Sequence, residues 1–234
     1  MTTPAVHCYC HASRFARRVL RRRLGRAVGS GLWGLVALLA LCPAKVGGGA
    51  TLPPLMELEQ AQEPVPTPAA AVVAALVDPL PILVSALGDC PNALSLQQRW
   101  RIARIINQQS VKHGYDPLFI TALVQVESGC SPTARGGDAL GLVQMLPSTA
   151  RGVAQRLGIP WRGERTLTEP SSSIQLGLHY LIELEEQLGD PYRAVAAYNL
   201  GPARVARMSS GRAQRTQYVR KILSLYERLL DLYA

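Results

Sequence analysis

The chain has little of what marks several common protein classes. Only five cysteines occur in 234 residues, too few for a disulfide-rich scaffold. Glycine and proline follow no three-residue period, which excludes collagen. Charged residues make up only 18%, but a hydrophobic fraction of 48% excludes a wholly disordered chain. The densest apolar run, Leu32–Leu41, is shorter than the ~20 residues that cross a bilayer.

Acidic residues are absent before Glu57, whereas seven arginines lie between Arg14 and Arg26. An uncharged stretch follows and ends in small residues near Ala44. A basic segment, a short apolar run and small residues together predict a secretory signal peptide over residues 1–44. An uncleaved N-terminal anchor is the alternative, and it would tether the protein to a membrane. Either interpretation predicts an exported protein.

The net charge of +9 at first suggests a nucleic acid or a membrane surface as partner. Much of that charge lies in the targeting segment, however. Residues 45–234 hold 18 basic and 16 acidic residues, a net charge of only +2. Since no nucleic-acid recognition motif accompanies the charge, we expect no nucleic-acid partner.

Removal of residues 1–44 leaves two of the five cysteines, Cys90 and Cys130. In an exported chain these two can pair, and the closed loop would stabilise the fold by ~3 kcal/mol. Two unpaired thiols are the alternative, because sequence alone gives no distance between them.

The remaining chain divides into a linker and a helical body. Residues 45–89 are rich in proline and alanine, which favours an extended linker. Residues 90–234 show helical periodicity with clear start and stop signals, and we expect an all-α domain there. Helices are predicted at residues 96–113, 117–127, 147–157, 171–188, 191–200 and 216–232. No β-hairpin is predicted.

One carboxylate stands out in this body. Glu127 ends the apolar helix that starts at Pro117 and is followed at once by Ser128 and Gly129. Apolar surroundings disfavour the ionised carboxylate, so its pKa rises and it can hold a proton at neutral pH. That property suits a general acid for glycosidic cleavage. The alternative is an ordinary glutamate that faces solvent at a helix end.

Three segments in order connect Glu127 with a known family. Glu127-Ser128-Gly129 is followed by Gly141–Ala150 (GLVQMLPSTA) and then by Ala197–Pro202 (AYNLGP). This order resembles the lytic transglycosylases with a soluble-lytic-transglycosylase (SLT), goose-type lysozyme-like domain. The resemblance runs from about Ala93 to the C-terminus. It implies a lysozyme-like helical domain, preceded here by the predicted signal peptide and the proline- and alanine-rich linker.

The resemblance also implies roles for individual residues. Glu127 matches the catalytic acid/base of the family. The residues that match its substrate-binding positions are Ser128, Gln144, Tyr198, Asn199 and Tyr218. No cofactor or metal is implied, and His113 and His179 lack companions at metal-ligand spacing.

The implied activity is cleavage of peptidoglycan between N-acetylmuramic acid and N-acetylglucosamine, with 1,6-anhydro-muramoyl products. The implied partner is the peptidoglycan glycan strand, the implied location is the periplasm or envelope of a bacterium, and we expect a monomer. The basic stretch Arg204–Lys221 is interpreted as a solvated face, with attraction for an anionic wall polymer as the alternative.

The chain departs from the family pattern at several positions. Val143 replaces the usual methionine, a change of similar volume. Cys130 stands where an aromatic or apolar residue is common, which favours pairing with Cys90. Asp138 is either a second carboxylate in the cleft or a loop residue, and the first case would leave lysozyme-like hydrolysis open. Gln214-Arg215-Thr216 replaces the usual Glu-Thr before Tyr218. A non-catalytic peptidoglycan-binding module is the remaining alternative.

Overall fold

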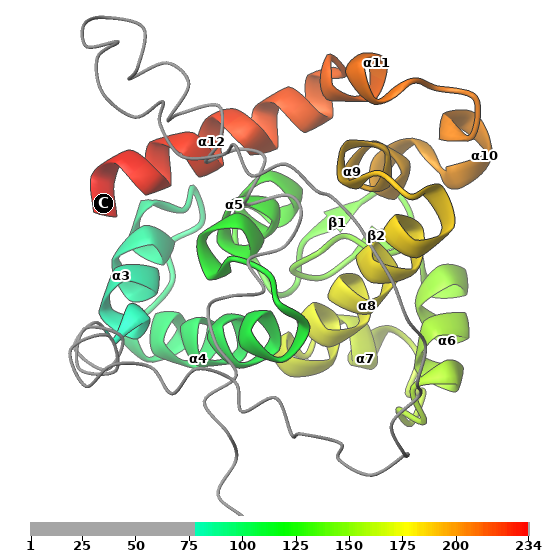
Figure 1. Ribbon diagram of the computed structural model, residues 1–234. Helices are drawn as coiled ribbons and strands as arrows, with labels where there is room; N and C mark the ends of the chain where they lie inside the picture. Colours follow the sequence, from blue (N-terminus) through cyan, green and yellow to red (C-terminus); the bar gives the residue numbers. More distant parts are fainter. Residues whose placement is uncertain (1–77, 234) are drawn as a thin grey trace, which may run out of the picture. The chain divides into compact units, whose positions relative to one another are not determined.

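The computed structural model describes residues 78–233. The predicted signal peptide or anchor and the linker up to Val77 lie outside these residues. The described chain is mostly helical, as predicted (Figure 1). Its elements are α3 Pro79–Ala86, the 3-10 helix η2 Leu87–Asp89, α4 Leu96–His113, α5 Pro117–Ser128, β1 Arg135–Gly136, β2 Ala139–Leu140, α6 Pro147–Arg156, α7 Glu164–Thr168, α8 Pro170–Leu188, α9 Pro191–Leu200, α10 Pro202–Val205, α11 Ser210–Gln214 and α12 Gln217–Tyr233.

The helix boundaries follow the capping residues of the sequence. Ser95 and Gln98 form a reciprocal capping box at the start of α4, which ends at the left-handed Gly114. The Asp-Pro pairs act in the same way, since the Asp116 carboxylate accepts from the Leu118 amide at 2.8 Å and that of Asp190 from the Arg193 amide at 2.9 Å. The six helices predicted from the sequence are therefore confirmed to within one or two residues.

Helix α5 lies in the centre of the described body. It packs against α4 on one side and α12 on the other, and α8 packs against both α4 and α9 (Figure 1). Seven of its twelve residues are buried, from Phe119 to Val124 together with Ser128. The apolar composition of this helix thus reflects contact with neighbouring helices around most of its circumference.

The predicted linker boundary at residue 89 was wrong. Residues 78–89 form α3 and η2, and Leu83 and Leu87 are buried in the main core. The Gln125 side-chain amide donates to the Ala86 carbonyl at 2.7 Å, which joins this segment to α5. Proline at residues 79 and 81 indicated a linker, but Pro79 occupies the first turn of a helix capped by Asp78, where proline is well tolerated.

The prediction that no β-hairpin is present was also wrong. β1 and β2 form a two-residue antiparallel pair, too short for an alternating apolar pattern to show in the sequence. Gly141 follows with φ of +81°, and a Cβ atom there would lie 1.9 Å from the Leu167 carbonyl oxygen. A side chain is excluded at this turn because α7 approaches its backbone so closely.

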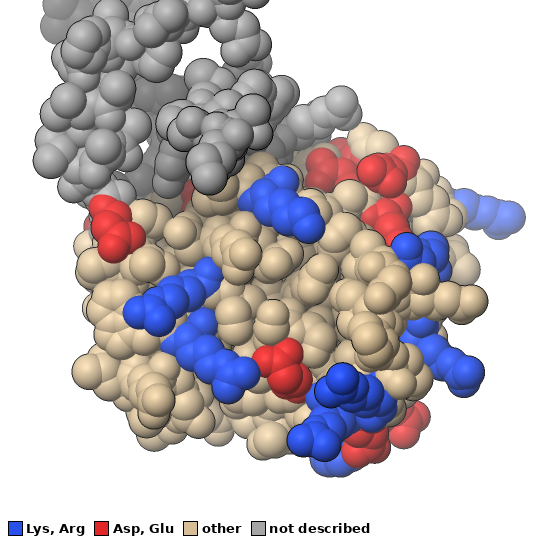
Figure 2. Space-filling model, turned by 90° about the horizontal axis from the view of Figure 1, so that it is seen from below, with Lys and Arg blue, Asp and Glu red and all other residues tan. Residues whose placement is uncertain are grey.

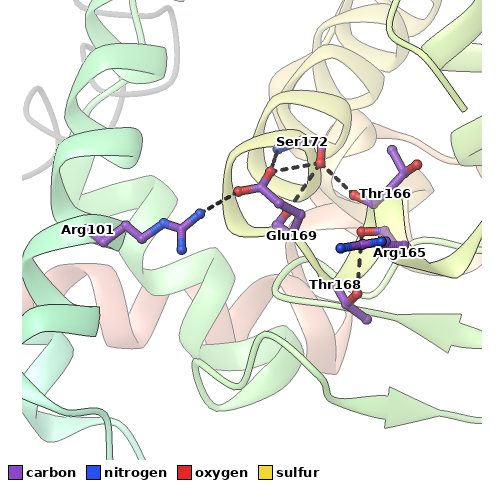
Figure 3. Close-up of polar contacts among 6 residues, drawn as sticks. All are labelled: Arg101, Arg165, Thr166, Thr168, Glu169 and Ser172. Carbon is purple, nitrogen blue, oxygen red and sulfur yellow. Dashed lines mark hydrogen bonds and ion pairs between the residues drawn. The ribbon is translucent and has the colours of Figure 1, made fainter. Parts of the chain in front are cut away.

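Exposed ion pairs connect neighbouring elements around α4, α6, α7 and α8. Figure 3 shows Glu169 at the start of α8, where its carboxylate accepts from the Ser172 amide at 2.8 Å and receives Arg101 of α4 at 2.9 Å. On the face drawn in Figure 2, acidic side chains lie among the basic ones. Two further pairs join Arg135 with Glu164 and Arg156 with Glu183. Of the described helices, none is long and apolar enough to span a membrane.

Candidate active site

Glu127 lies near the C-terminal end of α5, two residues before the left-handed Gly129 that ends the helix. Its side chain is only partly exposed. Burial raises the pKa of Glu127 to about 7, although a hydrogen bond from Tyr218 and the charge of Lys221 both act to lower it. The carboxyl group is therefore divided between its protonated and ionised forms at neutral pH, as the apolar sequence around it suggested.

Tyr218 reaches Glu127 from the start of α12, the last helix of the described chain. Its hydroxyl group donates a hydrogen bond to the Glu127 carboxylate, across 91 positions of the sequence. Burial and the Glu127 charge raise the pKa of Tyr218 well above its usual range, so the phenol stays a donor. Thr216 helps to place this tyrosine, because its hydroxyl bridges the Ala213 carbonyl and the Val219 amide at the start of α12.

Lys221 is the cation whose charge lowers the pKa of Glu127. It lies three residues after Tyr218 on α12 and is exposed. Residues three apart share one face of a helix, so a tyrosine that points at the carboxylate places Lys221 on the same side. Sequence reasoning grouped Lys221 with a solvated basic stretch and missed this coupling, although the three-residue spacing could have revealed it.

Tyr198 lies in α9 and forms a second side of the site. Its hydroxyl donates to the Val143 carbonyl at 3.0 Å, and its ring lies 5.5 Å from that of Tyr180. Burial, followed by the charge of Glu127, raises the pKa of Tyr198 well above its usual range. Gly177 permits this packing, because a Cβ atom there would lie 2.8 Å from the Tyr198 hydroxyl. Asn199 follows at an exposed position.

Gln144 lies in the loop between β2 and α6, with the uncommon φ of +46°. Its side-chain amide donates to the Ala134 carbonyl at 3.0 Å and to the Gly141 carbonyl at 2.8 Å. The buried neighbour Val143 carries the carbonyl that accepts from Tyr198. Gln144 therefore holds the hairpin and the following loop together, and its contact with a saccharide stays a prediction.

Ser128 is buried and its hydroxyl donates to the Val124 carbonyl at 3.1 Å within α5. Its own carbonyl accepts from the Asn92 side chain at 3.0 Å. Two residues later, Cys130 forms a disulfide with Cys90, with Cα atoms 5.9 Å apart. These contacts connect the end of α5 to the segment before α4. The predicted contact of Ser128 with substrate stays a prediction.

The remaining candidates from the sequence are Asp138 and two histidines. Asp138 is exposed in the turn between β1 and β2. His113 and His179, 66 positions apart, come together with ring centroids 4.6 Å apart. Within residues 78–233, however, no three histidine, cysteine or acidic side chains group as metal ligands do.

The sequence of this domain matches a known protein family. The model described as the transglycosylase SLT domain matches residues 104–220, half of the chain. The chain belongs to this family. The matched region contains Glu127, Gln144, Tyr198, Asn199 and Tyr218, which come from four separate segments of the SLT domain.

Curated relatives carry the same domain in longer chains. The membrane-bound lytic murein transglycosylase C of Photorhabdus laumondii is 32% identical over 153 residues, which cover 59% of this chain and 43% of the relative. The endo-type membrane-bound lytic murein transglycosylase A of Klebsiella pneumoniae is 37% identical over 114 residues, 43% of this chain and 55% of the relative. The chain thus spans about half the length of these relatives.

A solved structure shows the same fold. The lytic transglycosylase Slt of Pseudomonas aeruginosa, solved as an inactive glutamate-to-glutamine mutant, matches with a TM-score of 0.50 and 26% identity. The match covers 61% of this chain and 26% of that one. The lysozyme-like helical SLT fold expected from the sequence is therefore confirmed.

Proposed function

We propose that this SLT domain is a peptidoglycan lytic transglycosylase that acts in the bacterial periplasm or envelope. It cleaves the β-1,4 bond between N-acetylmuramic acid and N-acetylglucosamine and leaves 1,6-anhydro-muramoyl ends. The observation that carries the proposal is the half-buried Glu127, which has a pKa of about 7 and a hydrogen bond from Tyr218. The names of the relatives from Photorhabdus laumondii and Klebsiella pneumoniae support the same substrate class.

Glu127 acts first as the general acid. Its proton passes to the glycosidic oxygen while the bond from that oxygen to the muramoyl anomeric carbon breaks, so the N-acetylglucosamine portion leaves as an alcohol. A pKa close to neutral pH suits this step, because a large fraction of the enzyme then holds the proton. Tyr218 stabilises the carboxylate that remains.

Glu127 acts next as the general base. It accepts the proton of the muramoyl 6-hydroxyl group while that oxygen forms a bond to the anomeric carbon of the same sugar. The product is the 1,6-anhydro ring, no water is consumed, and Glu127 regains the proton that it gave up. One carboxylate is sufficient because the substrate supplies the nucleophile, whereas a hydrolase usually uses a second carboxylate. The charged and polar groups that shift the pKa of Glu127 are Lys221 and Tyr218, and neither is a carboxylic acid.

The test incubates the full chain with purified peptidoglycan in water enriched in oxygen-18 and analyses the products by mass spectrometry. We expect 1,6-anhydro-muramoyl ends without the heavy isotope, and no release by the Glu127→Gln variant. Reducing ends that carry oxygen-18 would contradict transglycosylation and support lysozyme-like hydrolysis. Binding without any release would support the peptidoglycan-binding module.

A further inference from the structure

The segment from residue 191 to residue 226 contains no aspartate or glutamate. It runs from α9 through α10 and α11 to most of α12, and we call it the basic segment. Its seven cationic residues are Arg193, Arg204, Arg207, Arg212, Arg215, Arg220 and Lys221. A run of 36 residues with a charge of +7 contrasts with residues 78–190, where eleven acidic and nine basic residues give a net charge of −2.

Of these seven cations, only Arg193 has side-chain hydrogen bonds to other described residues. The Arg193 guanidinium donates to the Leu188 carbonyl at 3.1 Å and to the Ala206 carbonyl at 2.6 Å. The other six side chains are exposed. The side-chain ion pairs among described residues join Arg101 with Glu169, Arg135 with Glu164 and Arg156 with Glu183, and none of them reaches the basic segment.

The basic segment also builds part of the active site. Helix α9 carries Tyr198 and Asn199, and α12 carries Tyr218. Helices α10 and α11 lie between α9 and α12 in the sequence, and both pack against α9. One cation of the segment, Lys221, lies three residues after Tyr218 on α12, and its charge lowers the pKa of Glu127. A ligand that extends from Glu127 along α12 would therefore pass exposed cations for which the described residues show no side-chain ion pair.

We propose that the basic segment recognises the carboxylates carried by the glycan strand. This inference rests on the proposed function and deepens it. Each muramic acid bears a lactyl carboxyl group, either free or extended by a stem peptide with carboxylates of its own, whereas N-acetylglucosamine bears none. Guanidinium groups pair well with carboxylates. The basic segment thus selects carboxylate-bearing wall glycan over a neutral sugar polymer.

Continuity with the catalytic residues favours the substrate itself over a separate polyanion such as a lipid surface. Helix α12 holds Arg220 and Lys221 together with Tyr218. The other exposed cations lie on or next to α10 and α11, which pack against the helix α9 that carries Tyr198. Exposed charges act over a distance of about 10 Å at moderate salt, so only a ligand that already occupies the site receives the full attraction of residues such as Lys221.

The first variant replaces four arginines of the basic segment with glutamine: Arg204, Arg207, Arg212 and Arg215. Its matched control replaces four exposed arginines elsewhere, which removes the same charge: Arg104, Arg151, Arg165 and Arg228. Both are compared with the unmodified full chain on two substrates. One is native peptidoglycan, and the other is the same material with its carboxylates converted to methylamides. Circular dichroism checks that all three proteins are folded.

We expect the basic-segment variant to lose about 10-fold in kcat/KM on native peptidoglycan at low salt, mainly through a higher KM. The loss disappears in ~0.5 M salt and on the methylamidated substrate, and the control variant changes less than about 2-fold. Equal losses on both substrates, or equal losses in both variants, would overturn the proposal. So would a KM that is unchanged on native material.

A binding assay separates this proposal from the proposed function. Sedimentation of each protein with native and methylamidated peptidoglycan measures affinity in the Glu127→Gln background, where no cleavage is expected. If the unmodified chain forms no anhydro ends but binding still depends on the carboxylates and on the basic segment, the proposed function fails and this inference stands. If the protein binds vesicles of anionic lipid, and binds native and methylamidated peptidoglycan equally well, the inference fails.

Discussion

The two parts of the described chain carry charge in different ways. Residues 78–190 hold acids and bases in similar numbers, and three of the acids pair with arginines across helices or loops. The basic segment, residues 191–226, has seven cations and no acid. The first part uses charge to join its own elements. In the second, only Arg193 does so, through backbone carbonyls.

The candidate site lies where these two parts meet. The first part supplies the carboxyl group of Glu127 on α5, and the second supplies Tyr218 and Lys221 on α12. Burial raises the pKa of that carboxyl group, while the donor and the cation lower it. The result near 7 comes from opposing effects of two regions, and substitutions in either region should move it.

We expect the largest effect from removal of Glu127, the acid that the first part contributes. Glu127→Gln should lower the rate of anhydro-product release at least ~1000-fold, since it removes both proton-transfer steps. A carboxyl group whose pKa is higher in the folded than in the unfolded protein binds its proton more tightly when folded, so its ionisation destabilises the fold.

The same variant should therefore be more stable than the unmodified protein by about 2–3 kcal/mol at pH 8, above the folded pKa of about 7. This difference should vanish below pH 4.5, where both states are protonated. Thermal unfolding followed by circular dichroism at pH 4 and pH 8 measures both predictions. A stability difference independent of pH would contradict the raised pKa.

We expect the second-largest effect from removal of the hydrogen bond between Tyr218 and Glu127, which joins the two parts. Tyr218→Phe deletes the hydrogen bond to Glu127, and we expect kcat to fall ~10- to 100-fold. Because that hydrogen bond lowers the pKa of Glu127, its loss should move the alkaline limb of the activity profile to higher pH. Tyr180→Phe, which keeps the ring beside Tyr198, is the matched control. A pH profile that does not move would show that the phenol is not coupled to the carboxyl group.

A smaller effect should follow from one acid placed in the basic segment. Gln214→Glu introduces a carboxylate at the end of α11. We expect KM on native peptidoglycan to rise about 3-fold at low salt while kcat changes little. Gln214→Leu, of similar size and without charge, should leave KM near that of the unmodified protein. A lower KM for Gln214→Glu would contradict the carboxylate-recognition proposal.

The smallest effect is expected in the paired region. Glu183→Gln breaks the 2.6 Å pair with Arg156, whose side chain is 56% exposed. Such pairs contribute less than about 1 kcal/mol, and this one lies outside the described cluster around Glu127. We expect Tm to fall by at most a few degrees, with unchanged kcat and KM. A kinetic defect would show that charge pairing in the first part also serves catalysis.

Local signals in the sequence were sufficient for most helices and for the catalytic candidate. Ser95, Asp116 and Asp190 cap the helices that they predict, and the motifs around Glu127, Gln144 and Tyr198 indicated the SLT family. Local signals failed at α3. Proline occurs both in linkers and in the first turn of helices, so Pro79 and Pro81 did not distinguish a linker from a helix. Only the burial of Leu83 in the core shows that this segment is a helix of the domain.

The sequence by itself determined where helices begin and end, which carboxyl group has apolar neighbours, and that residues 191–226 carry no acid, because each of these depends on adjacent residues. The tertiary structure alone decided that Tyr218 and Lys221 act on Glu127, that Cys90 meets Cys130, and that Gln144 holds a loop together. These contacts join residues distant in the chain, and only the packing of α5, α9 and α12 sets their distances.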